Sequence, residues 1–380
     1  MDVVPAKSNC MTASETFKEK RRKLLFDLTL IILSTFFLFW GLYKAQSFLI
    51  PIATAVLFAL LMIPVSNILE AWKINRIVAS LINTMLLLLL TLGFFFLISV
   101  QIKGFLEDWD QIVETLQPKV ESLENFILTH TPVDRQQLEE YKKENDISSL
   151  SGSGNGTDAA FRVLQSVFGF TADFLLTFIY IFFLINYRRR FKLFLLKLFP
   201  REKQSEALRV IVKTARVAQK YMFGKFVLII FLTVLYAIGL GISGVDNFVF
   251  ISILAALLSL IPYIGNIIGF GLAMALGVAS GGESGTLLGI VIVFSVTQFI
   301  ETYILEPYVV GDQVDIHPFF IIVTVILANI IWGVMGMVLV VPLVGMLNVV
   351  LKNVDSLKVF GFLLGNGDDE GQVDDNTKVV

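Results

Sequence analysis

The sequence predicts an all-α polytopic membrane protein with about eight transmembrane segments, two of them centrally broken or re-entrant, and a small extracytoplasmic helical insert. Composition is the first reason. Hydrophobic residues make up 56% of the 380 residues and charged residues only 16%, where a soluble domain has about 25% charged residues. The second reason is that long apolar runs recur along the chain, and about 20 apolar residues in a helix suffice to cross a bilayer core.

The N-terminal 100 residues are predicted to hold a cytoplasmic tail, residues 1–23, and three spans within residues 24–100, at 24–43, 48–69 and 77–100. The first apolar run is longer than the core of a signal peptide, which has about 7–15 residues, so we expect an uncleaved span. A cluster of Lys and Arg directly precedes this run. Positive charge collects on the cytoplasmic side, which predicts a cytoplasmic N-terminus.

The middle of the chain alternates in charge. Residues 101–158 are polar and mostly acidic, which predicts an extracytoplasmic helical insert, and residues 159–187 hold the fourth span. Residues 188–225 are strongly basic with apolar residues at helical intervals, which predicts helices lying on the cytoplasmic membrane surface. A C-terminal membrane unit with broken segments, residues 226–352, precedes a cytoplasmic tail, residues 353–380, that we expect to be partly disordered.

Two long apolar runs of the C-terminal unit are interrupted near their centres. The run 248–280 contains the sequence IPYIGN, and the run 319–351 contains Trp332-Gly333 and Gly336. If each run crosses once, the protein has eight spans and the loop 306–317 lies outside; if each is a re-entrant hairpin, it has six and that loop is cytoplasmic. The absence of Lys and Arg from this loop favours eight. Paired broken segments are typical of a transporter binding site.

Several ionisable residues lie in or beside these apolar runs, where charge is costly and usually functional. Glu301 and Glu306 are the candidates to exchange a proton or a cation during transport, and Asp173 in the fourth span is a third. His317 is a candidate proton relay. The alternatives are structural: the two glutamates could cap or pair, and His317 could cap the last helix.

Residues at the two breaks are predicted to line the solute pathway, because broken helices expose free carbonyl and amide groups. They are Pro262, Tyr263, Gly265 and Asn266 at the first break, and Gln298, Pro307 and Gly311 near the second. An interhelical hydrogen bond is an equal alternative for Asn266, and packing is an alternative for Tyr263.

Three motifs carry a resemblance to a known family: LSLIPYIGNIIGF at 258–270, IETYILEPYVVGDQVDIHPF at 300–319, and WGVMGMVLVVPL at 332–343. Together they resemble the autoinducer-2 exporter family of bacterial membrane permeases. The resemblance implies export of a small polar signalling molecule such as autoinducer-2, or exchange of a monovalent cation for protons, by a homo-oligomer such as a pentamer. Thr302, Glu306 and Tyr308 stand where the family commonly has Asn, Gln and a basic residue, which favours a cationic or proton-coupled solute.

Other classes of function are weighed against this one. The sequence has no P-loop and no H-E-x-x-H motif, and one Cys with two His cannot form a Cys/His zinc site. The G-x-S-G match at Gly241–Gly244 resembles rhomboid proteases but is short enough to arise by chance. We therefore expect no enzyme, cofactor or nucleic-acid partner, but a multi-pass protein of the bacterial cytoplasmic (inner) membrane with both termini cytoplasmic. A non-transporting scaffold or regulator is the alternative.

Overall fold

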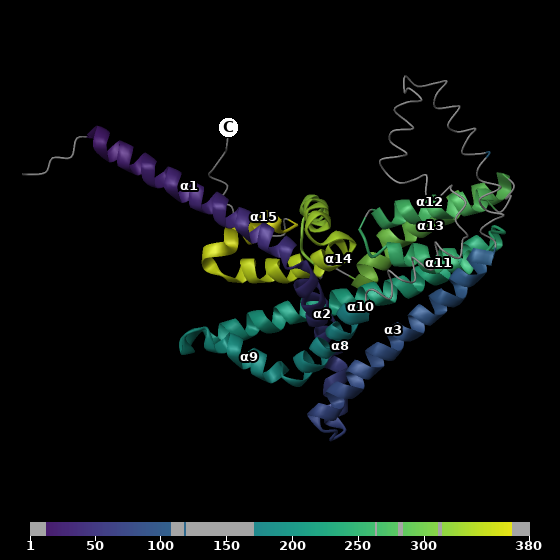
Figure 1. Ribbon diagram of the computed structural model, residues 1–380, viewed down its shortest axis with the longest axis horizontal. Coiled ribbons are helices and arrows are strands. Elements are labelled where there is room, and N and C mark those ends of the chain that lie inside the picture. Colours follow the sequence, from purple (N-terminus) through teal and green to yellow (C-terminus); the bar gives the residue numbers. More distant parts are fainter. Residues whose placement is uncertain are drawn as a thin grey trace, which may run out of the picture. The chain divides into compact units, whose positions relative to one another are not determined.

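The structure is a computed structural model that describes residues 13–107, 118, 171–262, 264–279, 284–310 and 314–366 (Figure 1). Regular secondary structure in these residues is helical. Six of their helices are long and apolar enough to cross a membrane, and three more are apolar but shorter. The prediction of an all-α polytopic membrane protein is confirmed. Most of the predicted insert, the N-terminal 12 residues and the residues after Asn366 lie outside the described ranges.

Helix α1 (Ala13–Lys44) belongs to a unit of its own, residues 1–49. No residue of its apolar part, from Arg21 to Lys44, is buried. Large side chains such as Phe36, Phe37 and Trp40 are exposed on it. A helix that is apolar on all sides needs an apolar surrounding, so α1 is suited to contact with lipid.

The second unit, residues 50–380, begins with most of α2 (Gln46–Ala71) and α3 (Arg76–Glu107), and continues after the insert with α8 (Thr171–Asn186). Buried residues of these helices form one apolar cluster around Ala55, Ile181 and Ile185. Arg188, the first residue of α9 (Arg188–Lys197), donates to Asn67 at 2.9 Å and to Glu70 at 3.0 Å. This charge-assisted network fixes the start of α9 to the end of α2.

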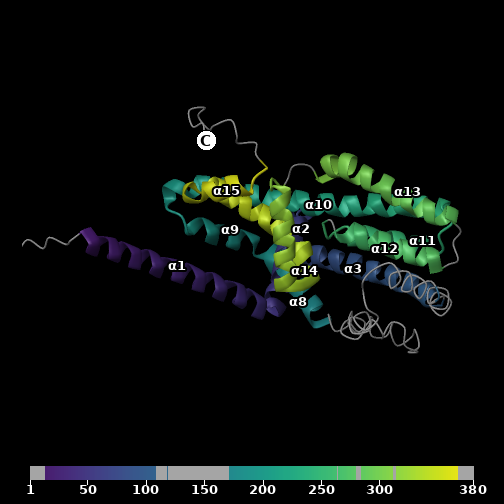
Figure 2. The ribbon, with the colours of Figure 1, turned by 90° about the horizontal axis from the view of Figure 1, so that it is seen from above.

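Helix α10 (Gln204–Ile242) follows the short 3-10 helix η1 (Arg201–Lys203) and is the central element of the second unit. The sequence interpretation divided this segment at Lys225, but no proline interrupts it and one helix of 39 residues forms. Leu228, Leu232, Tyr236 and Leu240 are fully buried. Their four-residue spacing places them on one face, against which α11, α12 and α13 pack (Figure 2).

The first broken run folds back on itself as α11 (Phe248–Leu258) and α12 (Ile264–Ala279). At the turn, a Cβ on Gly265 would lie 1.6 Å from the carbonyl oxygen of Leu258, so only glycine fits there. Farther along, a Cβ on Gly269 would lie 3.1 Å from the Cβ of Ala255. The two helices are therefore antiparallel neighbours, and the hairpin begins and ends on the same side.

The second broken run also folds back. It follows α13 (Ser284–Ile300) and a π-helix, η2 (Glu301–Val310), and forms α14 (Pro318–Asn353), whose Gly333 has φ 61° and ψ −149°. A straight helix of this length would be about 54 Å long. Yet Lys352 at its end donates to the carboxylate of Asp315, just before its start. α14 is thus a helical hairpin with its tip at Gly333.

Two short helices close the described chain, η3 (Asp355–Leu357) and α15 (Lys358–Leu364). The backbone N–H of His317 donates to the carbonyl of Leu364 at 2.8 Å, which holds α15 beside the start of α14. The hairpin alternative therefore describes both broken runs, in place of single tilted crossings. The lack of Lys and Arg in the loop before α14 was a poor guide, because Lys352 and Lys213 supply positive charge to that loop from other helices.

Candidate functional site

The residues of the candidate site come from α10, α12, α13 and η2, which lie side by side in the second unit (Figures 1 and 2). Glu301, the first residue of η2, is only 4% exposed. The side-chain amide of Asn266 on α12 donates to the carboxylate of Glu301 at 3.1 Å and also to the side-chain oxygen of Gln298. Gln298 donates in turn to Thr302 at 3.0 Å. The tip of the first hairpin is thereby bonded to the carboxylate predicted to be functional.

Glu306 accepts a hydrogen bond from the ammonium of Lys225 on α10, with 3.3 Å between the two atoms. Lys225 is 8% exposed, whereas the Glu306 side chain is 46% exposed. Electrostatic interactions also couple Glu301 to both of these residues. Lys225 therefore pairs with Glu306 and interacts electrostatically with Glu301, and with all three groups charged they carry one negative charge in excess.

Two further polar atoms close to Glu301 have no hydrogen-bond partner. They are the amide oxygen of Asn266 and the hydroxyl of Tyr236, and both are buried. Tyr236 lies on α10, interacts electrostatically with Glu301, and packs its ring against Phe294 with centroids 4.7 Å apart. Buried polar atoms normally have partners. These two oxygen atoms are therefore free to contact a bound cation, a protonated group or a polar solute.

The backbone of η2 sets the spacing of the two glutamates. A π-helix is rare and is found mostly at functional sites, and η2 contains Pro307, which has no N–H to donate. Glu301 lies at its start and Glu306 just before the proline, so one irregular helix carries both carboxylates. The turn of a π-helix is wider than that of an α-helix, so residues on η2 do not follow α-helical spacing.

The structure brings together three of the predicted site residues, Glu301, Asn266 and Gln298, and places Glu306 on the same short helix. For Asn266 it shows the interhelical hydrogen bond considered as the alternative. Pro262 lies in the turn of the first hairpin, two residues before the start of α12, the helix that carries Asn266. Tyr263 and Gly311 lie outside the described residues, and of Asp173 only the backbone, in α8, is described.

His317 is used as a helix cap. Its ring nitrogen Nδ1 accepts the backbone N–H of Phe319 at 3.2 Å, and Pro318 takes the first position of α14. Asp315 is likewise engaged, by Lys352 and by the backbone N–H of Asn366 at 2.9 Å. The structure thus shows for His317 the cap that was the alternative to a proton relay.

Lys225 and Tyr236 are the site residues that the sequence interpretation missed. Lys225 was counted with the basic stretch before it. The preceding basic residue, Lys220, is more than one helical turn away, and apolar residues follow Lys225. A single lysine at the edge of an apolar run is the signal that could have identified it. Within the described residues, no group of three or more His, Cys, Asp or Glu side chains is placed to hold a metal ion.

Apolar helices that fold around a buried, hydrogen-bonded charged cluster define a polytopic membrane protein with a polar site inside its membrane unit. The particular family follows from comparison with known proteins. The model of the AI-2E family transporters matches residues 28–356, and the chain belongs to this family. The resemblance inferred from its three motifs is confirmed, and membership in a family of transporters supports a role in membrane transport.

The curated relatives carry names of the same kind. The chain is 26% identical to "Putative transport protein YueF" of Bacillus subtilis, over 50% of this chain and 52% of that protein, so this match spans about half of the relative's length. A Borreliella burgdorferi protein with the same description, without a specific name, is 22% identical over 94% of this chain and 95% of its own length. A third, MT0215 of Mycobacterium tuberculosis, is 24% identical over 82% of this chain.

Proposed function

We propose that this protein is a secondary transporter in which Glu301, Glu306 and Lys225 couple proton movement to the movement of a solute. The observation that carries the proposal is the cluster of a buried carboxylate, Glu301, a half-exposed carboxylate, Glu306, and a nearly buried ammonium group, Lys225. Such a cluster is costly in an apolar surrounding when it is not neutral. It becomes neutral by binding one proton or one monovalent cation, so the two compete for the same place.

Competition for one place is the chemical basis of exchange. A cation bound between Glu301 and the unpartnered oxygens of Asn266 and Tyr236 leaves no need for a proton, and a proton on Glu301 removes the charge that holds the cation. Export of a small polar signalling molecule such as autoinducer-2 uses the same polar site, with the amide groups of Asn266 and Gln298 as hydrogen-bond partners. The extra acidic residue Glu306 favours the cation.

The two hairpins supply the route. Each begins and ends on one side, so their tips at Gly265 and Gly333 reach into the membrane unit from its edges. Non-helical backbone at membrane depth is tolerated where it lines a cavity or is buried in protein, and broken helices of this kind hold the sites of many transporters. Solute would pass by alternating exposure of the site that Asn266, at the first tip, helps to form.

The orientation proposed for this cycle places both termini in the cytoplasm. Arg188, Arg189 and Arg190 follow directly on α8, and further Lys and Arg residues occupy α9 and the first half of α10. Positive charge beside spans marks the cytoplasmic side. The family resemblance adds assembly as a homo-oligomer, such as a pentamer, in the bacterial inner membrane, and native mass spectrometry of the detergent-solubilised protein measures its subunit number.

The test is proton movement in proteoliposomes that contain the purified protein. Sodium, lithium or potassium is added under an imposed proton gradient while a trapped dye reports internal pH. We expect cation-dependent proton movement in the wild type, and its loss in Glu301→Gln and in Glu306→Gln. Glu202→Gln is the matched control, because Glu202 is an exposed carboxylate on η1, and it should behave as wild type.

Other outcomes separate the alternatives. If wild-type vesicles show no response to any cation but take up labelled small polar molecules, the solute is organic and the carboxylates act in its binding. If neither flux occurs, the scaffold function replaces the proposal. Wild-type flux in a glutamate variant removes that residue from the coupling mechanism.

A further inference from the structure

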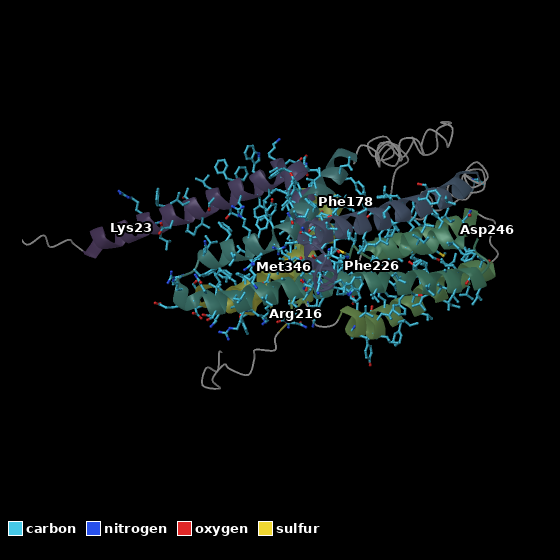
Figure 3. The ribbon with its side chains drawn as sticks, turned by 90° about the horizontal axis from the view of Figure 1, so that it is seen from below. Lys23, Phe178, Arg216, Phe226, Asp246 and Met346 are labelled. Carbon is cyan, nitrogen blue, oxygen red and sulfur yellow. The ribbon has the colours of Figure 1, made fainter. Side chains whose placement is uncertain are left out.

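A cavity lies away from the charged cluster, between α2, α9, α10 and the end of α14. Its volume is about 1050 Å³, which is at the upper end of the range for small-molecule pockets. Its walls are mainly aliphatic, and include Val56, Leu60, Leu195, Val210, Ile211 and Val350. We call this region the α9–α10 groove; Figure 3 labels Arg216 and Met346, which line it from α10 and α14.

The polar part of the groove is strongly basic. Six Lys and Arg side chains line it, against two carboxylates, Glu206 and Asp355. Arg188 and Arg76 are engaged by Glu70 on α2, so the excess of positive charge falls on the other four, Arg189, Lys192, Lys203 and Arg216. These four residues belong to α9, η1 and α10, and all four are exposed.

One polar atom inside the groove has no partner. The hydroxyl of Thr214, on the wall formed by α10, is buried and makes no hydrogen bond. Most hydroxyl groups in helices donate to the carbonyl four residues before, as Thr233 does on the same helix at 2.8 Å. An unpartnered hydroxyl in an otherwise aliphatic wall is suited to a ligand that has an acceptor group next to a hydrocarbon chain.

The groove is lined by a helix of the kind found at membrane surfaces. α8 is apolar and ends at Asn186, and α9 follows after one residue with the sequence RRRFKLFLLK. Phe191, Phe194 and Leu195 are exposed on α9 among its basic residues. A short helix with basic and apolar residues next to a span is typical of the interface between head groups and acyl chains. Exposed apolar and basic side chains therefore occur together on the helix that lines the groove.

We propose that the α9–α10 groove binds one anionic phospholipid of the adjoining leaflet. An acyl chain lies along the aliphatic walls, the phosphate is held by Arg189, Lys192 and Arg216, and an ester carbonyl accepts the Thr214 hydroxyl. A soluble anion leaves the aliphatic walls uncovered, and a zwitterionic lipid does not offset the excess positive charge. An anionic phospholipid matches both parts of the groove, and this site is separate from the charged cluster around Glu301.

The experiment measures lipid binding to the full-length purified protein. A spin-labelled phosphatidylglycerol is titrated into protein reconstituted in phosphatidylcholine vesicles, and the immobilised fraction is read by electron paramagnetic resonance. We expect a saturable component of one lipid per chain. The double variant Arg189→Gln/Lys192→Gln should weaken it by roughly 30-fold, since each basic side chain near an anionic surface contributes about fivefold.

The matched control is Arg190→Gln/Lys197→Gln, which removes the same charge from the same helix at positions that do not line the groove. It should retain the saturable component. A second variant, Ala215→Phe, fills the groove from α10 without changing its charge and should displace the acyl chain. Together the two variants separate the contribution of charge from that of the groove.

Four results would overturn the proposal. Equal loss in the control variant would mean general attraction to the basic surface. Equal competition by inorganic phosphate would mean that the aliphatic walls are not used. Undiminished binding in Ala215→Phe would place the lipid elsewhere. A change of subunit number in Ala215→Phe, with no saturable lipid component in the wild type, would mean that a second copy of the chain occupies the groove.

Discussion

The ion pair between Lys225 and Glu306 should stabilise the fold asymmetrically, because its two members differ in burial. Lys225 is 8% exposed and the Glu306 side chain 46% exposed. In Glu306→Gln a nearly buried ammonium group loses its charged partner and keeps at most a neutral amide oxygen as acceptor. Removal of one partner from a buried pair costs about 3–5 kcal/mol, and Glu301 is close enough to offset part of this. We expect a loss of about 3 kcal/mol for Glu306→Gln.

The reverse change should cost less. In Lys225→Met an apolar chain of similar length replaces the buried lysine, and the half-exposed Glu306 carboxylate keeps access to other hydrogen-bond donors. The buried Glu301 carboxylate also loses a nearby positive charge and becomes neutral by binding a proton. We expect a loss of about 1 kcal/mol, the cost of one ordinary hydrogen bond. The double variant Lys225→Met/Glu306→Gln leaves no uncompensated ammonium group and should also lose only about 1 kcal/mol. The coupling between the two sites is then about 3 kcal/mol.

The measurement is reversible denaturant unfolding in mixed micelles, followed by circular dichroism for the four members of the cycle. Asp355→Asn/Lys358→Met is the matched control, since this pair on η3 and α15 is exposed and exposed ion pairs contribute little to stability. Additive losses at Lys225 and Glu306, within about 0.5 kcal/mol, would refute the reasoning. So would a larger loss for Lys225→Met than for Glu306→Gln.

Three further predictions concern the hairpins. Gly265→Ala should destabilise the first hairpin by at least about 3 kcal/mol, because its Cβ would overlap a backbone carbonyl. The yield of folded protein in size-exclusion chromatography measures this loss. Gly271→Ala is the control, because a Cβ at Gly271 has open space. Gly333→Ala should cost about 1–3 kcal/mol, since φ 61° with ψ −149° is a conformation of glycine, and an unchanged unfolding midpoint would contradict the hairpin tip. Burial raises the pKa of Asp315, but hydrogen bonds from Lys352 and from the backbone of Asn366 outweigh this and hold the pKa below its ordinary value. The stabilisation from the charged Asp315 carboxylate is therefore complete above about pH 4 and is lost as the pH falls through the lowered pKa. The difference in stability between wild type and Asp315→Asn should shrink over the same fall in pH.

The parts of the fold and site that follow local rules could be predicted from the sequence. Apolar runs indicated the helices, and Pro262 and Gly265 indicated the first break. On a continuous helix Gln298, Glu301 and Thr302 share a face, and the hydrogen bond from Gln298 to Thr302 shows two of them as neighbours. Each of these inferences depends on residues within a few positions of one another.

The contacts that the sequence could not supply join distant positions. Lys225 and Glu306 are separated by 81 residues, and no local periodicity relates them. The same applies to Asp315 and Lys352, 37 residues apart, whose pairing decides that α14 folds back. A π-helix also has no periodic apolar signature, so the sequence did not indicate η2. In each case tertiary packing, rather than local propensity, determines the outcome.

The closure of α14 by Asp315 and Lys352 has a consequence for biosynthesis. The aspartate leaves the ribosome 37 residues before the lysine that neutralises it, so the first arm of the hairpin is complete before its end can be fixed. Because the two ends of the hairpin meet at these two residues, both charges can stay on the side from which the chain enters while the apolar arms and the glycine tip enter the bilayer. The hairpin can therefore be inserted as a single loop, late in synthesis, without carrying a charged side chain across the membrane.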